Sequence, residues 1–181
     1  MAHHMMEHGP ELARFARARI AQELGGPVAQ PPPGTWTAEH HATFVTLRWR
    51  DGDLQGCIGS LSAERPIVLD VERNAVAAAI RDPRGEHLVL ANIKDLDLEL
   101  SILSPLERVA SWDDIRPRSD GVVLVHRGRR GTFLPVMWEM FPDKPEFLRQ
   151  LERKAELPTS YDQRQLEIWR YTAAKFEDPA P

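Results

Sequence analysis

The sequence is poorest in cysteine: its 181 residues contain one, Cys57, so no disulfide can form within the chain. Secreted proteins rarely keep a lone thiol, so this count favours a reducing compartment and a cytoplasmic protein. A long apolar run is also missing, which argues against a membrane span. The polar start, MAHHMMEHGP, lacks the apolar core of a signal peptide.

Positive charge is not in excess, because 23 lysines and arginines face 27 acidic residues and the net charge is −4. Nucleic-acid-binding domains normally carry a basic footprint, so this balance argues against nucleic acid as a partner. A local exception is the expected turn over residues 127–130, which contains Arg127, Arg129 and Arg130. The sequence also lacks a P-loop, a Rossmann glycine fingerprint, HExxH and CxxC, so we predict neither a cofactor nor a metal site.

The hydrophobic periodicity predicts an α+β fold. Apolar residues at helical spacing predict helices over residues 10–24, 66–80 and 144–157, and Ser111 with Asp114 forms a capping pair for a short helix. Alternation predicts strands over residues 43–50, 54–61, 97–103, 122–126 and 132–134, whereas residues 166–176 fit a strand or a helix. Hairpins interrupted by helices indicate a mainly antiparallel sheet flanked by helices. We expect a disordered leader over residues 1–9, a domain over residues 10–178 and a tail over residues 179–181.

The most informative segment is LQGCIGS, residues 54–60, where two glycines flank Cys57 within a predicted strand. Glycine is kept in strands where a positive φ, a bulge or a close backbone approach requires it. Cys57 is the candidate nucleophile, because thiolates react readily near neutral pH. The alternative is a structural role, because free cysteine often acts as a small core residue. No histidine or carboxylate lies at a recognisable spacing to serve as its base.

Three further residues belong to the candidate site. Asn74 lies in an alanine-rich helix, where a buried amide must find partners, and Asp82 is expected to bridge a turn before Arg84, whose fork could hold a phosphate or carboxylate. We predict a cleft beside Cys57 that takes a small ligand with an anionic or carbonyl group. Its predicted binding residues are Gln55, Gly56, Ile58, Gly59, Asn74, Asp82 and Arg84.

Read in order, several segments resemble the AMMECR family: Gly-Cys-Ile-Gly at 56–59, Asn-Ala at 74–75, Asp-Pro-Arg at 82–84, LELSILSP at 98–105, Asp-Gly at 120–121 and GTFLP at 131–135. The resemblance spans residues 11–178. It implies an α+β structure with a larger and a smaller subdomain, whose boundary the sequence does not give, and a cleft between them near Cys57. The family usually has arginine at position 55, so Gln55 removes a cation from the implied site.

The resemblance implies partners but no reaction. In microbes the family is similar to one component of a three-part system with a Memo-type protein and a radical SAM enzyme. The sequence therefore leaves three hypotheses. The first is an accessory module that binds a ligand or partner at the cysteine loop. The second is an enzyme that uses Cys57 for acyl or group transfer, and the third is nucleic-acid binding through the turn at residues 127–130.

Overall fold

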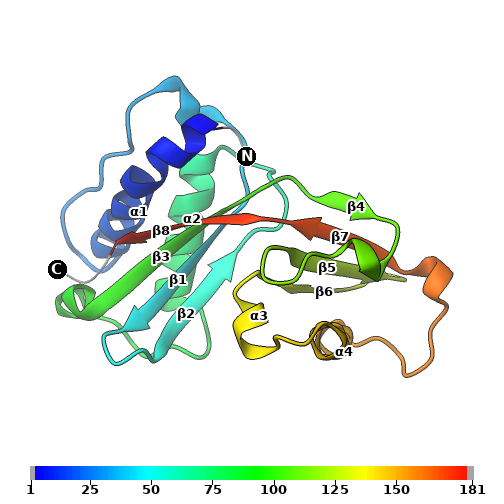
Figure 1. Ribbon diagram of the computed structural model, residues 1–181. Helices are drawn as coiled ribbons and strands as arrows, with labels where there is room; N and C mark the ends of the chain where they lie inside the picture. Colours follow the sequence, from blue (N-terminus) through cyan, green and yellow to red (C-terminus); the bar gives the residue numbers. More distant parts are fainter. Residues whose placement is uncertain (1–2, 179–181) are drawn as a thin grey trace. The chain divides into compact units, whose positions relative to one another are not determined.

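The computed structural model describes residues 3–178, which form two compact units, each with its own sheet (Figure 1). Unit 1 contains the chain up to Leu103 and from Ala174 onward, and unit 2 contains residues 104–173. The α+β class is confirmed, and the strand pairs β1–β2, β1–β3, β4–β7, β5–β6 and β5–β7 are antiparallel. The strands are divided between two sheets, where the sequence analysis expects one.

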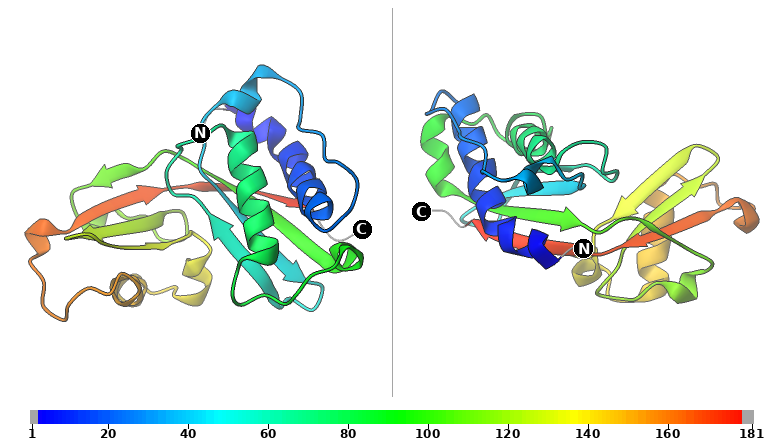
Figure 2. Two further views of the ribbon diagram at one scale, coloured as in Figure 1. Left: turned by 180° about the vertical axis from the view of Figure 1, so that it is seen from behind. Right: turned by 90° about the horizontal axis from the view of Figure 1, so that it is seen from above.

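Unit 1 has a four-stranded sheet in the order β2-β1-β3-β8. Its helices are α1 (His3–Glu23) and α2 (Ile67–Ile80), with 3-10 turns at Thr35–Ala38 and Leu90–Asp95; its strands are β1 (Thr43–Trp49), β2 (Leu54–Gly59), β3 (Leu96–Leu103) and β8 (Ala173–Asp178). Both helices lie on the same face of the sheet (Figures 1 and 2). We call the opposite side of this sheet the helix-free face.

The core of unit 1 lies between the two helices and the sheet. Helical spacing places Leu12, Ala16 and Ile20 on one side of α1, and all three are buried against the sheet and α2. Alternate residues of the central strands, including Val45 and Leu100, fill the other side of this core. The intervening residues of β1 therefore point to the helix-free face.

Helix α1 begins at His3 instead of Pro10, so the expected disordered leader is wrong for residues 3–9. The helix runs through Pro10. Gly9, before this proline, packs against the ring of Phe176 in β8, and a Cβ at Gly9 would lie 2.2 Å from that ring. Proline is typical of a first helical turn, which explains the displaced start. Residues 1–2 and the tail at 179–181 lie outside the described residues.

Unit 2 has a second four-stranded sheet in the order β4-β7-β5-β6. Its elements are β4 (Glu107–Val109), β5 (Gly121–His126), β6 (Arg129–Phe133), β7 (Glu167–Tyr171), α3 (Met137–Met140) and α4 (Lys144–Lys154), with 3-10 turns at Trp112–Asp114 and Gln163–Gln165. The cap predicted for the short helix is confirmed, because Ser111 accepts the N–H of Asp113 and pairs with Asp114. The core stacks Trp138 on Phe147 at 3.7 Å between ring centroids.

Two predicted segments of unit 2 differ from the structure. The turn that joins β5 and β6 contains only Arg127 and Gly128, both with positive φ, and Arg129 and Arg130 belong to β6. The ambiguous stretch over residues 166–176 is two strands, β7 and β8, one in each sheet. Thr172 separates them and donates its N–H to Ser104 Oγ at 2.9 Å.

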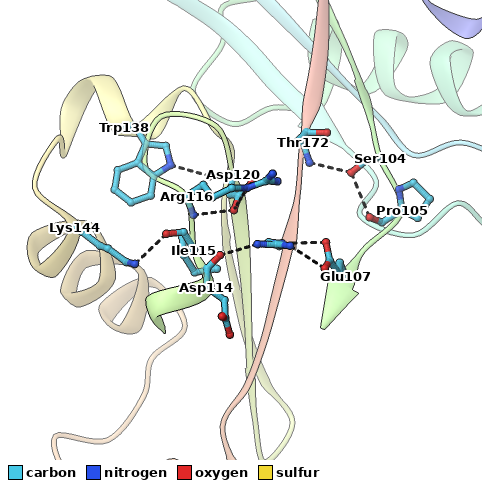
Figure 3. Close-up of polar contacts among 11 residues, drawn as sticks. Ser104, Pro105, Glu107, Asp114, Ile115, Arg116, Asp120, Trp138, Lys144 and Thr172 are labelled. Carbon is cyan, nitrogen blue, oxygen red and sulfur yellow. Dashed lines mark hydrogen bonds and ion pairs between the residues drawn. The ribbon is translucent and has the colours of Figure 1, made fainter. Parts of the chain in front are cut away.

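A polar cluster fixes the loop before β5 (Figure 3). The carboxylate of Asp120 is fully buried and receives the side chain of Arg116 at 2.8 Å, while its carbonyl receives Trp138 Nε1 at 2.7 Å. Lys144 Nζ donates to the carbonyl of Ile115 at 2.9 Å. These bonds explain the Asp120-Gly121 pair as part of the framework of unit 2.

Candidate functional site

The cysteine segment forms β2, the edge strand of the unit 1 sheet. Leu47 pairs with Gly56 and Arg48 pairs with Leu54, so Gln55 has no partner on β1 and forms a bulge. A bulge inserts one extra residue into a strand, so side chains at and beyond it no longer follow the regular alternation between the two faces. Gln55 consequently points toward α2.

The side chain of Gln55 is fully buried and tethers β2 to the end of α2. Its Nε2 donates to the carbonyls of Ala79 at 3.2 Å and Glu86 at 2.9 Å, and its Oε1 accepts from Trp49 Nε1 at 3.1 Å and from the N–H of Glu86 at 3.2 Å. The prediction that Gln55 lines a ligand surface is therefore wrong, because the protein itself uses both ends of the amide.

The two glycines that flank Cys57 are required because neighbouring atoms leave no room for a Cβ at either position. Neither belongs to the glycines with positive φ, so that part of the sequence argument is wrong. A Cβ at Gly56 would lie 2.1 Å from the carbonyl oxygen of Ala78, and one at Gly59 would lie 2.1 Å from Phe44 Cγ. Gly56 thus allows the backbone of β2 to approach α2 closely. A close backbone approach is one of the reasons that the sequence analysis gives for a glycine in a strand.

Asp82 connects Cys57 to Arg84. Its Oδ2 accepts the N–H of Cys57 at 2.9 Å and the Nη2 of Arg84 at 2.6 Å, and its Oδ1 accepts the N–H and Nε of Arg84 at 3.1 and 2.9 Å. The predicted turn role is confirmed. The hydrogen bonds from the Arg84 side chain hold the pKa of Asp82 well below its usual range, against the opposing effect of burial, and Asp82 in turn raises the pKa of Arg84.

Asn74 belongs to a buried network that fastens the other end of β2. Its Nδ2 donates to the carbonyl of Thr43 and to Asp70 Oδ2, both at 3.0 Å. Asp70, which the sequence analysis missed, also accepts the Ser60 hydroxyl at 2.8 Å and Arg65 Nη1 at 2.7 Å. Asn74 is therefore a framework residue that lies one turn along α2 from Asp70.

The thiol of Cys57 is half-buried and lies on the helix-free face, since Ile58, the next residue, packs against the core. Thr46 of β1 pairs with Cys57 in the hairpin, and its hydroxyl donates a hydrogen bond to Sγ at 3.3 Å. The guanidinium of Arg84 interacts electrostatically with Cys57. Among residues 3–178, no imidazole or carboxylate forms a hydrogen bond with this sulfur. Strand alternation together with the register of the hairpin would have identified Thr46 as the neighbour of Cys57.

A hollow of about 740 Å³ lies at the turn end of the β1–β2 hairpin, within unit 1. It is lined by Trp49, Arg50, Asp51, Asp53, Leu54, Arg84, Glu86 and Asp95. Four carboxylates and two guanidiniums give this lining an excess of negative charge, so the hollow itself does not suit an anion. Arg84 is the residue that belongs both to this lining and to the surroundings of Cys57.

Between His3 and Asp178, no three histidine, cysteine or acidic side chains are grouped so that they could hold a metal ion. Over the same residues, no helix combines the length and the apolar character that crossing a membrane requires.

A family model described as AMMECR1 matches residues 13–176, which is most of the chain. The chain belongs to the AMMECR1 family. Members similar to it include a Thermotoga maritima protein, 36% identical over 74% of this chain and 76% of that protein. Protein MJ0810 of Methanocaldococcus jannaschii is 32% identical over 97% of this chain and 92% of that protein.

The fold agrees with a solved member of the family. The crystal structure of the uncharacterized protein PH0010 from Pyrococcus horikoshii matches with a TM-score of 0.85 and 29% sequence identity. The match covers 97% of this chain and 93% of that one. The two-unit AMMECR1 fold therefore accounts for nearly the whole sequence.

Proposed function

We propose that this AMMECR1-family chain is an accessory module that binds a ligand or a partner at the Cys57 strand, on the helix-free face of unit 1. The observation that carries the proposal is the hydrogen bond from Thr46 Oγ1 to the sulfur. Nucleophilic cysteines are typically paired with a base that removes the thiol proton, whereas this hydroxyl donates a hydrogen bond to the sulfur and is not a base. The thiol and hydroxyl therefore suit contact better than turnover.

The ligand chemistry follows from Arg84. Its side chain is 57% exposed, and its bonds with Asp82 use Nε and Nη2, which leaves Nη1 for a ligand. A fixed guanidinium beside a hydroxyl and a thiol suits a small group with an anionic or carbonyl oxygen. Because the hollow that Arg84 also lines contains four carboxylates and only two guanidiniums, we propose that the ligand lies on the Cys57 side.

Nuclear magnetic resonance can test this site directly. Titration of the ¹⁵N-labelled chain with phosphate or acetate should shift the amides of Gly56, Cys57 and Arg84. Arg84→Gln should remove those shifts, whereas Arg130→Gln, which changes an exposed arginine of unit 2, should leave them intact. Shifts that persist in Arg84→Gln, or an absence of shifts near Cys57 in the parent, would refute the ligand site.

The enzyme hypothesis keeps one specific observation in its favour. The guanidinium of Arg84 interacts electrostatically with Cys57, so a cation accompanies the thiol, as it does at many reactive cysteines. Acyl or group transfer would still require a base for the incoming nucleophile. The test is whether Cys57 turns over an acyl donor or is only modified by it.

For macromolecular partners we propose, on the family resemblance alone, a Memo-type protein and a radical SAM enzyme. Calorimetric titration of the purified proteins tests this pairing. Nucleic acid remains disfavoured, because Arg127 Nε is bonded to Gln165 and Arg129 Nη1 to the carbonyl of Glu156. Phosphate contacts would have to compete with these bonds.

A further inference from the structure

His126, the last residue of β5, is a buried titratable group outside the Cys57 site. It is 4% exposed, and neither ring nitrogen has a hydrogen-bond partner among the residues that the structure describes. Buried polar atoms are nearly always paired, so two unpaired nitrogens on one ring call for a physical explanation.

The segment over residues 156–165, which we call the strap, follows α4 and contacts this histidine. The ring of Tyr161 lies 5.4 Å from that of His126, at 58° between planes. Three side-chain bonds hold the strap: Arg129 Nη1 to the carbonyl of Glu156, Tyr161 OH to Glu152 Oε1 at 2.5 Å, and Arg127 Nε to Gln165 Oε1 at 2.5 Å. Two of these bonds start from residues next to His126 in the β5–β6 hairpin.

The charged groups around His126 come from each of these elements. The hairpin contributes Arg127, which follows it, and Arg129, which pairs with it across the turn. The strap contributes Asp162, which interacts with His126 electrostatically but bonds to Arg164 Nε at 3.0 Å. Helix α4 contributes Glu152, which is engaged by Tyr161. Both carboxylates thus have other partners, and the two guanidiniums are bonded to Gln165 and to the carbonyl of Glu156.

We propose that protonation of His126 releases the strap, which makes this part of unit 2 sensitive to acid. A neutral ring leaves one donor and one acceptor unpaired in the closed strap, whereas a protonated ring leaves two donors and a charge. Opening of the strap admits water to both ring nitrogens, and the favourable hydration free energy is larger for the charged ring than for the neutral one. Histidine is the side chain whose charge most often changes between pH 5 and 8, so these are the pH values between which the proposal is tested.

Hydrogen exchange of the native chain at pH 7.5 and pH 5.5, corrected for the intrinsic pH dependence of exchange, tests the proposal. The amides of the strap should open at least about fivefold more readily at pH 5.5, while those of α2 in unit 1 should not respond. His126→Phe keeps a ring that cannot be protonated and should remove the pH effect. His87→Gln, at an exposed histidine of unit 1, should preserve it.

His126→Gln provides a second uncharged variant in case phenylalanine does not fit the site. The proposal is overturned if the strap is equally protected at both pH values in the parent. It is also overturned if the acid response persists in whichever of the two variants folds.

Discussion

At Asp82, one carboxylate receives the N–H of Cys57 and the guanidinium of Arg84, so a single buried residue positions two groups of the proposed contact surface. The sequence indicates its turn role, since Asp-Pro-Arg follows a helix. Its bond to Cys57 joins residues 25 apart in the chain and depends on the packing of α2 against β2, which no local pattern encodes.

Asp82→Asn should lower the free energy of unfolding by about 1–2 kcal/mol at pH 7, because the charge-assisted bonds weaken. Arg84 is mostly exposed, so solvent screening keeps the loss at this level. The pKa of Asp82 is lowered in the fold, so its contribution is present above the unfolded value of about 3.9 and is lost as the pH falls below it. Urea denaturation at pH 7 and pH 3 should therefore show a smaller difference at pH 3.

Glu139→Gln, which alters an exposed carboxylate, serves as the control and should leave stability within about 0.5 kcal/mol at both pH values. An Asp82→Asn loss that is the same at pH 3 and pH 7 would contradict the linkage.

Gly56→Ala should cost about 3 kcal/mol or more, because its Cβ would overlap the carbonyl of Ala78 and separate β2 from α2. Gly52→Ala is the matched control: its φ is +93° and no atom lies within 4 Å of its Cβ position, so only about 1 kcal/mol of backbone strain is expected. Thermal melts of both variants measure the difference. Equal destabilisation would mean that backbone conformation, rather than close approach, explains Gly56.

At the scale of elements, β2 is an edge strand that three buried side chains fasten to α2 and the loop after it: Gln55, Asp82 and Asp70. Hydrophobic periodicity identifies both elements and the hairpin turn, because α2 and β1 each bury one face. The bulge at Gln55 is invisible to periodicity, since it depends on the pairing register with β1. The sequence consequently places Gln55 on the ligand side, whereas the bulge turns it inward.

Gln55→Leu should destabilise the chain by about 2–4 kcal/mol, since it leaves Trp49 Nε1 and the backbone groups of Glu86 without a buried partner. Gln30→Leu, at an exposed position, should change stability by less than about 0.5 kcal/mol. Chemical denaturation of the two variants provides the comparison. A neutral Gln55→Leu would show that the tether contributes nothing to the docking of β2.

Short elements were beyond sequence reasoning for a related reason. Strand β4 has three residues and helix α3 has four, so neither is long enough for a hydrophobic period to be recognised in the sequence. Their positions depend on β7 and on the core of unit 2, which form only when distant segments meet.

At the scale of the whole chain, the first helix and the last strand both belong to unit 1. Arg17 of α1 joins them: its Nη1 donates to the carbonyls of Ile93 and Leu96 at 2.9 Å each, and its Nε and Nη2 donate to Asp178. Because these partners are far apart in sequence, the link could not be predicted from residue spacing.

Arg17→Met should keep the aliphatic packing of α1 and lose these bonds, at a cost of about 2–3 kcal/mol in the free energy of unfolding. Arg14→Met changes an exposed arginine one turn earlier and should be nearly neutral. Guanidinium denaturation followed by circular dichroism measures both. Two neutral variants would show that the ends of the chain do not stabilise unit 1 through Arg17.

The central claim is that Cys57 is a contact residue without a base, and product release from an activated acyl ester tests it most directly. Native chain is incubated with excess ester, the product released per chain is counted, and the intact mass is recorded. The account predicts at most one acyl group per chain, on Cys57, and no further release above the buffer rate. Sustained release over many equivalents, abolished in Cys57→Ser, would contradict it and establish Cys57 as a catalytic nucleophile.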